Sequence, residues 1–237
     1  MTIKERLRPF GHVAQRELSL PTIPNQAELW DWQHATRGVF GAEGKALLNT
    51  PNQSAVHFAS LLGEPSQVIE VGSASGRDAR SWAIDGHTVD CVDISRVALK
   101  QLRDQAQKQR VSSRIKTHRY DVSSGRLPNG IRHLANGFYA RSALHVSDDT
   151  MDRLAQDIDR RLSPGGVILV EGKHQDDEKI KRSHIVGQGL VLDSFENGHL
   201  RRVWTPKYMK HMCDLVEWDL EEITQDGGFI RMVAYKK

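Results

Sequence analysis

Short segments rich in β-branched residues alternate with longer, more polar segments through the middle of the sequence. The apolar segments have the length of buried strands, and several of the polar ones have the period of helices. Strands joined through helices form βαβ units with right-handed crossovers and a parallel sheet. We therefore predict a mainly parallel, doubly wound α/β sheet with strands at 67–71, 88–93, 115–120, 137–146 and 167–171.

The end of the chain has a different pattern. Residues 172–205 are polar and only weakly periodic, so no regular element is predicted there. A helix begins at Thr205-Pro206, and strands at 216–224 and 229–235 follow. The Asp226-Gly227 pair between these strands is typical of a hairpin turn. The prediction is a seven-stranded, mostly parallel sheet with a C-terminal antiparallel hairpin.

The first fifty residues precede this pattern. Residues 1–25 mix charges with three prolines and show no clear period. One helix is predicted from Gln26 to Phe40. Another runs to Leu62, with Pro51 at its first position and Thr50 as its cap. We divide the chain into an N-terminal arm or lid, residues 1–50, and one domain, residues 51–237.

Composition limits the class of protein. A chain of 237 residues can bury a core without a disulfide or a metal. Its longest aliphatic run, 167–170, is far shorter than the roughly twenty residues of a membrane span. The net charge is +3, and the sequence has no dense basic stripe of the kind that nucleic-acid-binding proteins show. The two cysteines are widely spaced and give no zinc signature. We expect a cytoplasmic protein without a metal site, and the sequence leaves a homodimer open.

A glycine-rich turn follows the first predicted strand, in the segment Glu70-Val71-Gly72-Ser73-Ala74-Ser75-Gly76. Open parallel sheets bind ligands beyond the carboxyl ends of their strands, and small residues let the backbone approach a ligand closely. Asp93 ends the second strand, where an acid can bind the hydroxyls of a ribose. The combination predicts a nucleoside cofactor. The alternative is a tight strand-to-helix turn, with Asp93 as a helix cap.

The turn also limits which nucleoside can bind. It lacks the G-x-G-x-x-G spacing of a dinucleotide site and the Gly-Lys-Ser/Thr end of a phosphate-binding loop. The acid Glu70 before the turn repels a pyrophosphate and attracts a cation. This favours S-adenosylmethionine, which carries an ammonium and a sulfonium.

These residues resemble the motifs of the class I S-adenosylmethionine-dependent methyltransferases, over about residues 55–237. The segment 70–77 looks like the acid-x-Gly-x-Gly-x-Gly motif, with Ala74 in place of the middle glycine. Further resemblances are at 92–95, 120–122, 139–145 and 162–166, and in the final hairpin. The resemblance implies a Rossmann-like fold with S-adenosylmethionine as cofactor. The cofactor-binding residues that it implies are Glu70, Gly72, Ser73, Ala74, Gly76, Asp93, Ile94, Asp121, Val122 and Arg141.

The acceptor side is predicted from fewer residues. His145 follows the fourth strand and has the pKa range of a general base, although a structural histidine is the alternative. Trp30 and Trp32 precede the core, either as part of a lid or as packing of the first helix. Arg141 and Lys173 are candidate substrate-binding residues. The basic stretches at 173–182 and 201–202 predict either an anion site or a solvated loop.

The leading functional prediction is methyl transfer to an oxygen, or a nitrogen, of a small and possibly anionic molecule. The chain resembles, more loosely, bacterial methyltransferases of natural-product and sugar metabolism. Two alternatives stay open. One is an RNA methyltransferase, which the absence of an RNA-binding module makes the weaker prediction. The other is a cofactor-binding protein without turnover, for which the substitution at Ala74 is the support.

Overall fold

The computed structural model describes residues 23–36, 50–193 and 198–237. Most of the predicted arm or lid, residues 1–50, lies outside the described residues. The part of it that is described forms helix α1 (Gln26–Thr36). In the described parts of the chain, no helix is long and apolar enough to cross a membrane.

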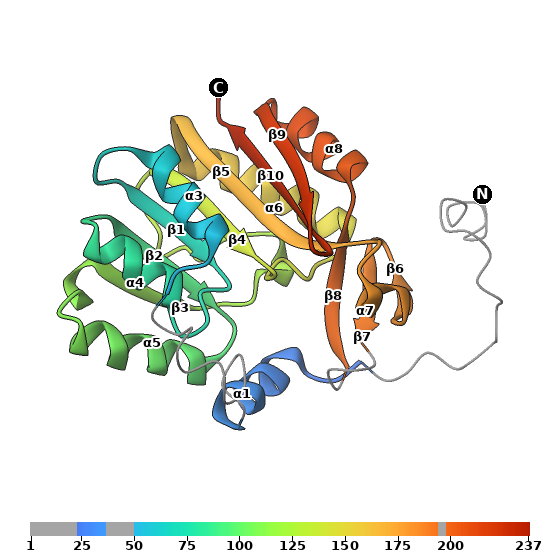
Figure 1. Ribbon diagram of the computed structural model, residues 1–237, viewed down its shortest axis with the longest axis horizontal. Coiled ribbons are helices and arrows are strands. Elements are labelled where there is room, and N and C mark those ends of the chain that lie inside the picture. Colours follow the sequence, from blue (N-terminus) through green and yellow to red (C-terminus); the bar gives the residue numbers. More distant parts are fainter. Residues whose placement is uncertain (1–22, 37–49, 194–197) are drawn as a thin grey trace.

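Seven strands form the central sheet in the order β3-β2-β1-β4-β5-β10-β9 (Figure 1). Neighbours among the first five are parallel, whereas β10 is antiparallel to both β5 and β9. This confirms the predicted Rossmann-like sheet with its C-terminal antiparallel hairpin. The strands are β1 (Gln67–Val71), β2 (Thr88–Asp93), β3 (Ile115–Arg119), β4 (Ala135–Arg141), β5 (Leu162–His174), β9 (Asp219–Asp226) and β10 (Phe229–Tyr235).

Helices cover both faces of this sheet. On one face, α3 (Gln53–Leu62), α4 (Arg77–Ile84) and α5 (Arg96–Lys108) contribute Phe58, Trp82 and Leu102 to an apolar core. On the other face, α6 (Asp148–Arg161) and α8 (Pro206–Val216) contribute Leu154 and Met212. Two short 3-10 turns, η2 (Ser112–Arg114) and η3 (Val122–Ser124), flank β3. The doubly wound arrangement follows from these two separate cores.

The segment 172–205 differs from the prediction, because it contains three strands and a short helix. These are α7 (Glu178–Lys181), β6 (His184–Gly187), β7 (Leu190–Asp193) and β8 (His199–Trp204). β8 runs parallel to the last two residues of β5, beyond the end of β4. The three strands β6–β8, called the β8 extension below, stand beside the end of the central sheet (Figure 1).

Buried charges explain why these strands were missed. Arg201 and Arg202 interrupt the apolar alternation of β8, yet both are buried. Arg201 Nε donates to Asp193 on β7 at 2.8 Å, and Arg202 Nη2 donates to Asp148 at 2.6 Å. The charges are paired across the strand and the neighbouring helix, so the segment forms a strand in spite of its composition.

Two predicted boundaries also change. The cap of α3 is Asn52, whose side chain accepts a hydrogen bond from the Ala55 amide at 2.9 Å, so Thr50 does not cap the helix. The fourth strand ends at Arg141 rather than near residue 146, because Ser142 has a left-handed backbone with φ of 51°. The chain therefore leaves the sheet after Arg141 and continues as a loop.

Candidate active site

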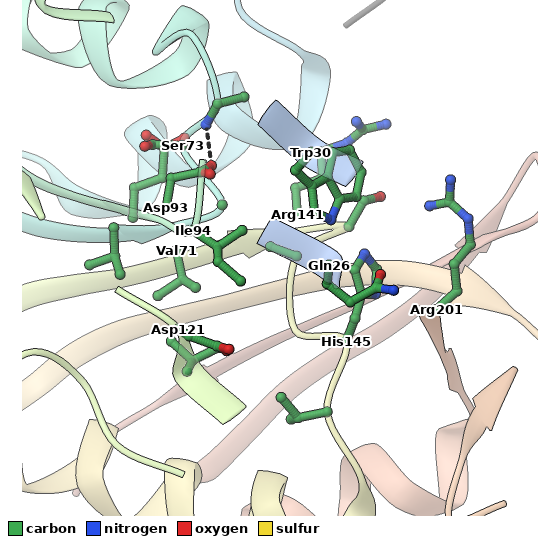
Figure 2. A pocket seen from close by; sticks show the side chains of 18 of the residues that line it. Gln26, Trp30, Val71, Ser73, Asp93, Ile94, Asp121, Arg141, His145 and Arg201 are labelled. Atoms are coloured by element: carbon green, nitrogen blue, oxygen red, sulfur yellow. Dashed lines mark hydrogen bonds between the residues drawn. The ribbon is translucent and has the colours of Figure 1, made fainter. Parts of the chain in front are cut away.

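A cavity of about 640 Å³ lies at the carboxyl ends of β1, β2, β4 and β5 (Figure 2). This is the edge at which open α/β sheets bind ligands. Its lining includes twelve of the predicted site residues: Glu70, Gly72, Ser73, Ala74, Asp93, Ile94, Asp121, Val122, Arg141, Trp30, His145 and Lys173. Gly76 and Trp32 are not among the lining residues.

The turn after β1 brings the backbone to the wall of the cavity. Gly72 has φ of 78°, and its amide donates to the Val92 carbonyl at 2.8 Å. A Cβ at this position would collide with the Cβ of Ala143 in the loop after β4. Ala74 has φ of 49°, so an alanine keeps the left-handed backbone here. Gly76 serves packing instead, because a Cβ there would collide with Leu102 of α5.

Asp93 is held at the cavity wall by two backbone amides. The Ala74 amide donates to Oδ2 and the Ser95 amide donates to Oδ1, both at 2.8 Å. Burial raises the pKa of this carboxyl to about 6, although the amide donors at Ser95 and Ala74 lower it. Each oxygen has a second lone pair, so the fixed carboxylate can accept from ligand hydroxyls.

Glu70 lies behind the turn, almost fully buried. Its Oε2 atom forms no hydrogen bond with the described residues. Burial raises the pKa of Glu70 well above its ordinary value, and the nearby carboxylates Asp78 and Asp93 raise it further. An ammonium group beside Glu70 would favour the ionised form and satisfy this oxygen. The position therefore fits a cationic end of a ligand.

Asp78 and Arg77 begin α4 next to this position. Asp78 accepts from the Asn52 amide at 3.1 Å and from Arg77 Nε at 3.0 Å. It also accepts from the Asn52 side chain, which links α4 to the cap of α3. Both residues line the cavity. Asp78 lies in the first turn of α4, where the helix dipole favours a carboxylate, and it also faces the cavity.

The third strand ends at another part of the lining. Asp121 accepts from the Ser123 amide at 2.9 Å and caps the 3-10 turn η3. Ile94 and Val122 line the same part of the cavity with apolar atoms. In Figure 2, Asp93, Ile94 and Asp121 lie on one side of the cavity, away from Arg201. This arrangement forms a flat apolar slot with an acid at its edge.

Two cations meet over one aromatic ring at the ends of β4 and β5. The guanidinium carbon of Arg141 lies 4.9 Å, and Nζ of Lys173 lies 3.9 Å, from the centre of the Phe229 ring. Arg141 Nε also donates to Glu171 at 2.5 Å, and Lys173 Nζ donates to Asp177 at 2.7 Å. These ion pairs fix both side chains in place. Arg141, Lys173 and Phe229 all line the cavity.

His145 lines the cavity, but its geometry does not fit the predicted general base. Nδ1 accepts a hydrogen bond from the Arg202 amide at 3.2 Å, so the neutral ring carries its proton on Nε2. Burial, followed by the charge of Arg201, lowers the pKa of His145 to about 3. A group with so low a pKa is a weak proton acceptor at neutral pH. The structure therefore gives His145 the character of a hydrogen-bond donor.

The two tryptophans of α1 take different positions. The Trp30 ring lies 6.4 Å from the His145 ring and nearly parallel to it, at 7°. Trp32 is 45% exposed and is not among the lining residues. Residues two apart on a helix point to different sides, so only one of the two can face the cavity. Trp30 therefore lines the cavity, Trp32 does not, and the substrate-binding role of each stays a prediction.

Other lining residues were not among the predicted site residues. Arg201 stood only in a basic stretch of uncertain role, and its place on the cavity wall depends on the β8 extension. Phe229 opens β10 opposite Lys173, which the predicted hairpin register could have suggested. Gln26 and His34 carry no sequence signal of their own, because α1 reaches the cavity only through tertiary contacts.

Comparisons with known proteins agree with this geometry. Residues 68–166 match the sequence model of a family described as a methyltransferase domain. A comparison with curated proteins gives no match. Solved structures share the fold. The CcbJ methyltransferase from Streptomyces caelestis has a TM-score of 0.68 and 17% identity, over 89% of this chain and 98% of that one.

Two further structures are similar. The 1,6-didemethyltoxoflavin-N1-methyltransferase of Burkholderia thailandensis, with its substrate and S-adenosylhomocysteine bound, has a TM-score of 0.60 and 19% identity, over 82% and 83% of the two chains. An S-adenosylmethionine-dependent methyltransferase from Mesorhizobium loti has a TM-score of 0.63 and 18% identity, over 76% and 96%. Residues 68–166 thus match a methyltransferase domain, and the chain has the fold of solved S-adenosylmethionine-dependent methyltransferases.

Proposed function

We propose that the protein transfers the methyl group of S-adenosylmethionine to a small anionic molecule. The distribution of charge in the cavity carries this proposal. The acids Glu70, Asp93 and Asp121 line one part of the cavity, and the cations Arg141 of β4, Lys173 of β5, Lys179 of α7 and Arg201 of β8 line another. A sulfonium cofactor fits the acidic side, and a negatively charged acceptor fits the basic side.

The acidic side has a place for each part of the cofactor. Asp93 would accept from the ribose hydroxyls, and Ile94 would pack against the adenine, with Asp121 at its edge. Glu70 would face the ammonium, where its Oε2 has no hydrogen-bond partner among the described residues. Arg141 and Arg77 would bind the carboxylate of the methionine part. The close approach of the turn at Gly72 leaves room for this part.

Methyl transfer itself needs little chemistry from the protein. The bound cofactor supplies the methyl group, whose bond to sulfur breaks as the bond to the nucleophile forms. The residues of the chain hold the two molecules aligned and exclude water, which supplies much of the rate. Nothing in the geometry of His145 favours an oxygen acceptor over a nitrogen acceptor. We therefore describe the acceptor by its charge, and natural-product or sugar metabolism stays a prediction.

Calorimetry and turnover together test this function. S-adenosylhomocysteine should bind the purified protein, and release of S-adenosylhomocysteine from S-adenosylmethionine should be faster with a panel of small acids than with their amides. Equal rates for acids and amides would contradict the anionic class. Binding without turnover on any acceptor would favour the non-catalytic alternative. Turnover on RNA with a steep salt dependence would favour the nucleic-acid alternative.

A further inference from the structure

We propose that His145 binds an anionic oxygen of the methyl acceptor through its Nε2–H group, and that the acceptor is a small carboxylic acid. This inference rests on the proposed function, because it names the group that the basic side of the cavity receives. It assigns His145 the role of an acceptor-binding residue rather than a base.

The β8 backbone fixes the tautomer of His145. The Arg202 amide donates to Nδ1, so this nitrogen carries no proton when the ring is neutral. Arg202 is itself held firmly, because its guanidinium donates to the Val146 carbonyl at 2.7 Å and to Asp148 at 2.6 Å. The β8 extension thus presets which ring nitrogen presents a hydrogen.

The hydrogen on Nε2 needs an acceptor. Nε2 is buried and forms no hydrogen bond with the described residues. A buried N–H group without a partner is unfavourable, and such groups are rare in folded proteins. His145 lines the cavity, so an atom of a ligand can supply the missing acceptor. Only an atom with a lone pair fits, which excludes an ammonium or a methyl group at this position.

The surroundings of the ring favour a negative atom. The cations Arg201 and Arg202 and the neighbouring His199 disfavour a positive charge on the ring, whereas the backbone of Ser142 favours a proton there. Trp30 covers one ring face and brings no charge. In Figure 2, Trp30, Arg141, His145 and Arg201 lie on the same side of the cavity. A carboxylate oxygen at Nε2–H would be stabilised by this field.

Binding of the carboxylate at His145 itself needs no base. A carboxylate is already ionised at neutral pH, so no proton has to be taken from that group before it binds. If the acid carries an aromatic ring, this ring would pack against the indole of Trp30 as an aromatic pair. The combination selects a small aromatic or conjugated acid over its neutral analogue.

Nuclear magnetic resonance on the intact protein tests the donor directly. The protein is labelled with ¹⁵N-histidine, saturated with S-adenosylhomocysteine and titrated with benzoate, with benzamide as the neutral control. We expect His145 to show the Nε2–H tautomer from about pH 5.5 to 8, since its pKa is about 3. Benzoate should shift the Nε2–H signal, and benzamide should shift it less.

Matched variants then separate the hydrogen bond from the shape of the ring. H145Q retains an N–H donor, and H145F retains a ring without one. Benzoate affinity should fall about tenfold in H145F, which corresponds to about 1.4 kcal/mol, and should stay within a few-fold of the wild type in H145Q. The affinity for S-adenosylhomocysteine should be unchanged in both variants.

Several results would overturn the inference. These are an Nδ1–H tautomer, a ring that titrates near pH 6, no benzoate shift at His145, or equal benzoate affinity in H145F and the wild type. Failure of S-adenosylhomocysteine to bind would instead contradict the proposed function. The tautomer measured without ligand is independent of that outcome, so the two failures are distinguishable.

Discussion

The turn after β1 depends on the absence of a Cβ atom at Gly72. Gly72 combines a left-handed backbone with direct contact to Ala143, so a side chain would be both strained and obstructed. Asp93 shows the same dependence on single atoms, because its two oxygens are placed by two backbone amides. At this scale the site is a set of fixed atoms rather than a flexible surface.

The contact at Gly72 predicts that a side chain there destabilises the protein and that a second substitution restores part of the stability. Gly72→Ala should lower the free energy of unfolding by about 1–3 kcal/mol through backbone strain, with a further loss from the collision with Ala143. Urea denaturation measures this. Gly165→Ala is the control, since Gly165 has φ of 75° and open space around it. Adding Ala143→Gly should recover part of the loss at Gly72, and an equal effect at both glycines would contradict the collision.

The raised pKa of Asp93 predicts a pH dependence in the free protein. A carboxyl whose pKa is about 6 when folded favours the folded state at low pH, and this contribution is lost as the pH rises through 6. Wild type should therefore gain stability relative to Asp93→Asn as the pH falls from about 7.5 to 5, by about 1.4 kcal/mol, with the rest of the gain below pH 5. Thermal melts across this range measure the difference. A constant difference would contradict the raised pKa.

At the scale of elements, α1 and the β8 extension enclose the cavity from two sides. Asp31 of α1 accepts from the Ser95 hydroxyl at 2.7 Å and from the Val97 amide at 3.1 Å, at the start of α5. Gln26 accepts from the Leu200 amide of β8 at 2.9 Å. Helix α1 therefore bridges α5 and β8, and carries Trp30 to the cavity (Figure 1).

Loss of the Asp31 contact should loosen this bridge. Asp31→Ala removes two hydrogen bonds, together worth about 2 kcal/mol, from the middle of α1, next to Trp30. We expect weaker binding of S-adenosylhomocysteine, by up to about tenfold, and faster proteolysis near α1. Asp31→Asn keeps one accepting oxygen and should show a smaller effect. Calorimetry with limited proteolysis measures both, and an unchanged protease pattern would argue against the bridge.

At the scale of the whole molecule, the sheet separates the two charges of the reaction. Strands β1 and β2 end at the acids, whereas the cations Arg141 and Lys173 lie at the ends of β4 and β5 and Arg201 lies within β8. The strand order places these ends side by side along one edge. One edge of one sheet would thus position a cationic cofactor beside the anionic acceptor that we propose.

This charge pattern predicts that cofactor binding releases protons. Glu70 and Asp93 have raised pKa values in the free protein; an ammonium beside Glu70 and ribose hydroxyls that donate to Asp93 would lower these values and favour ionisation. The affinity for S-adenosylhomocysteine should therefore rise with pH between about 5 and 7. The calorimetric enthalpy should vary with the ionisation enthalpy of the buffer. Glu70→Gln should reduce this variation, and buffer-independent enthalpies would contradict the assignment.

The local pattern of the sequence determined the sheet, the glycine turn and the acids that follow the strands. Periodicity, turn residues and strand ends are properties of neighbouring residues, so they can be read before the chain is folded. The hairpin at 229–235 and the place of Asp93 were predicted for this reason.

Only the tertiary structure decided the β8 extension, which of Trp30 and Trp32 lines the cavity, and the hydrogen-bond partner of His145. Arg202 meets His145 across 57 residues and Asp148 across 54. The partner of a buried charge and the tautomer of a histidine depend on such distant contacts, because the free energy of a polar group is set by what surrounds it after folding. The sequence therefore determined where a cofactor can bind. The packing of distant segments decided which side chains surround the rest of the cavity.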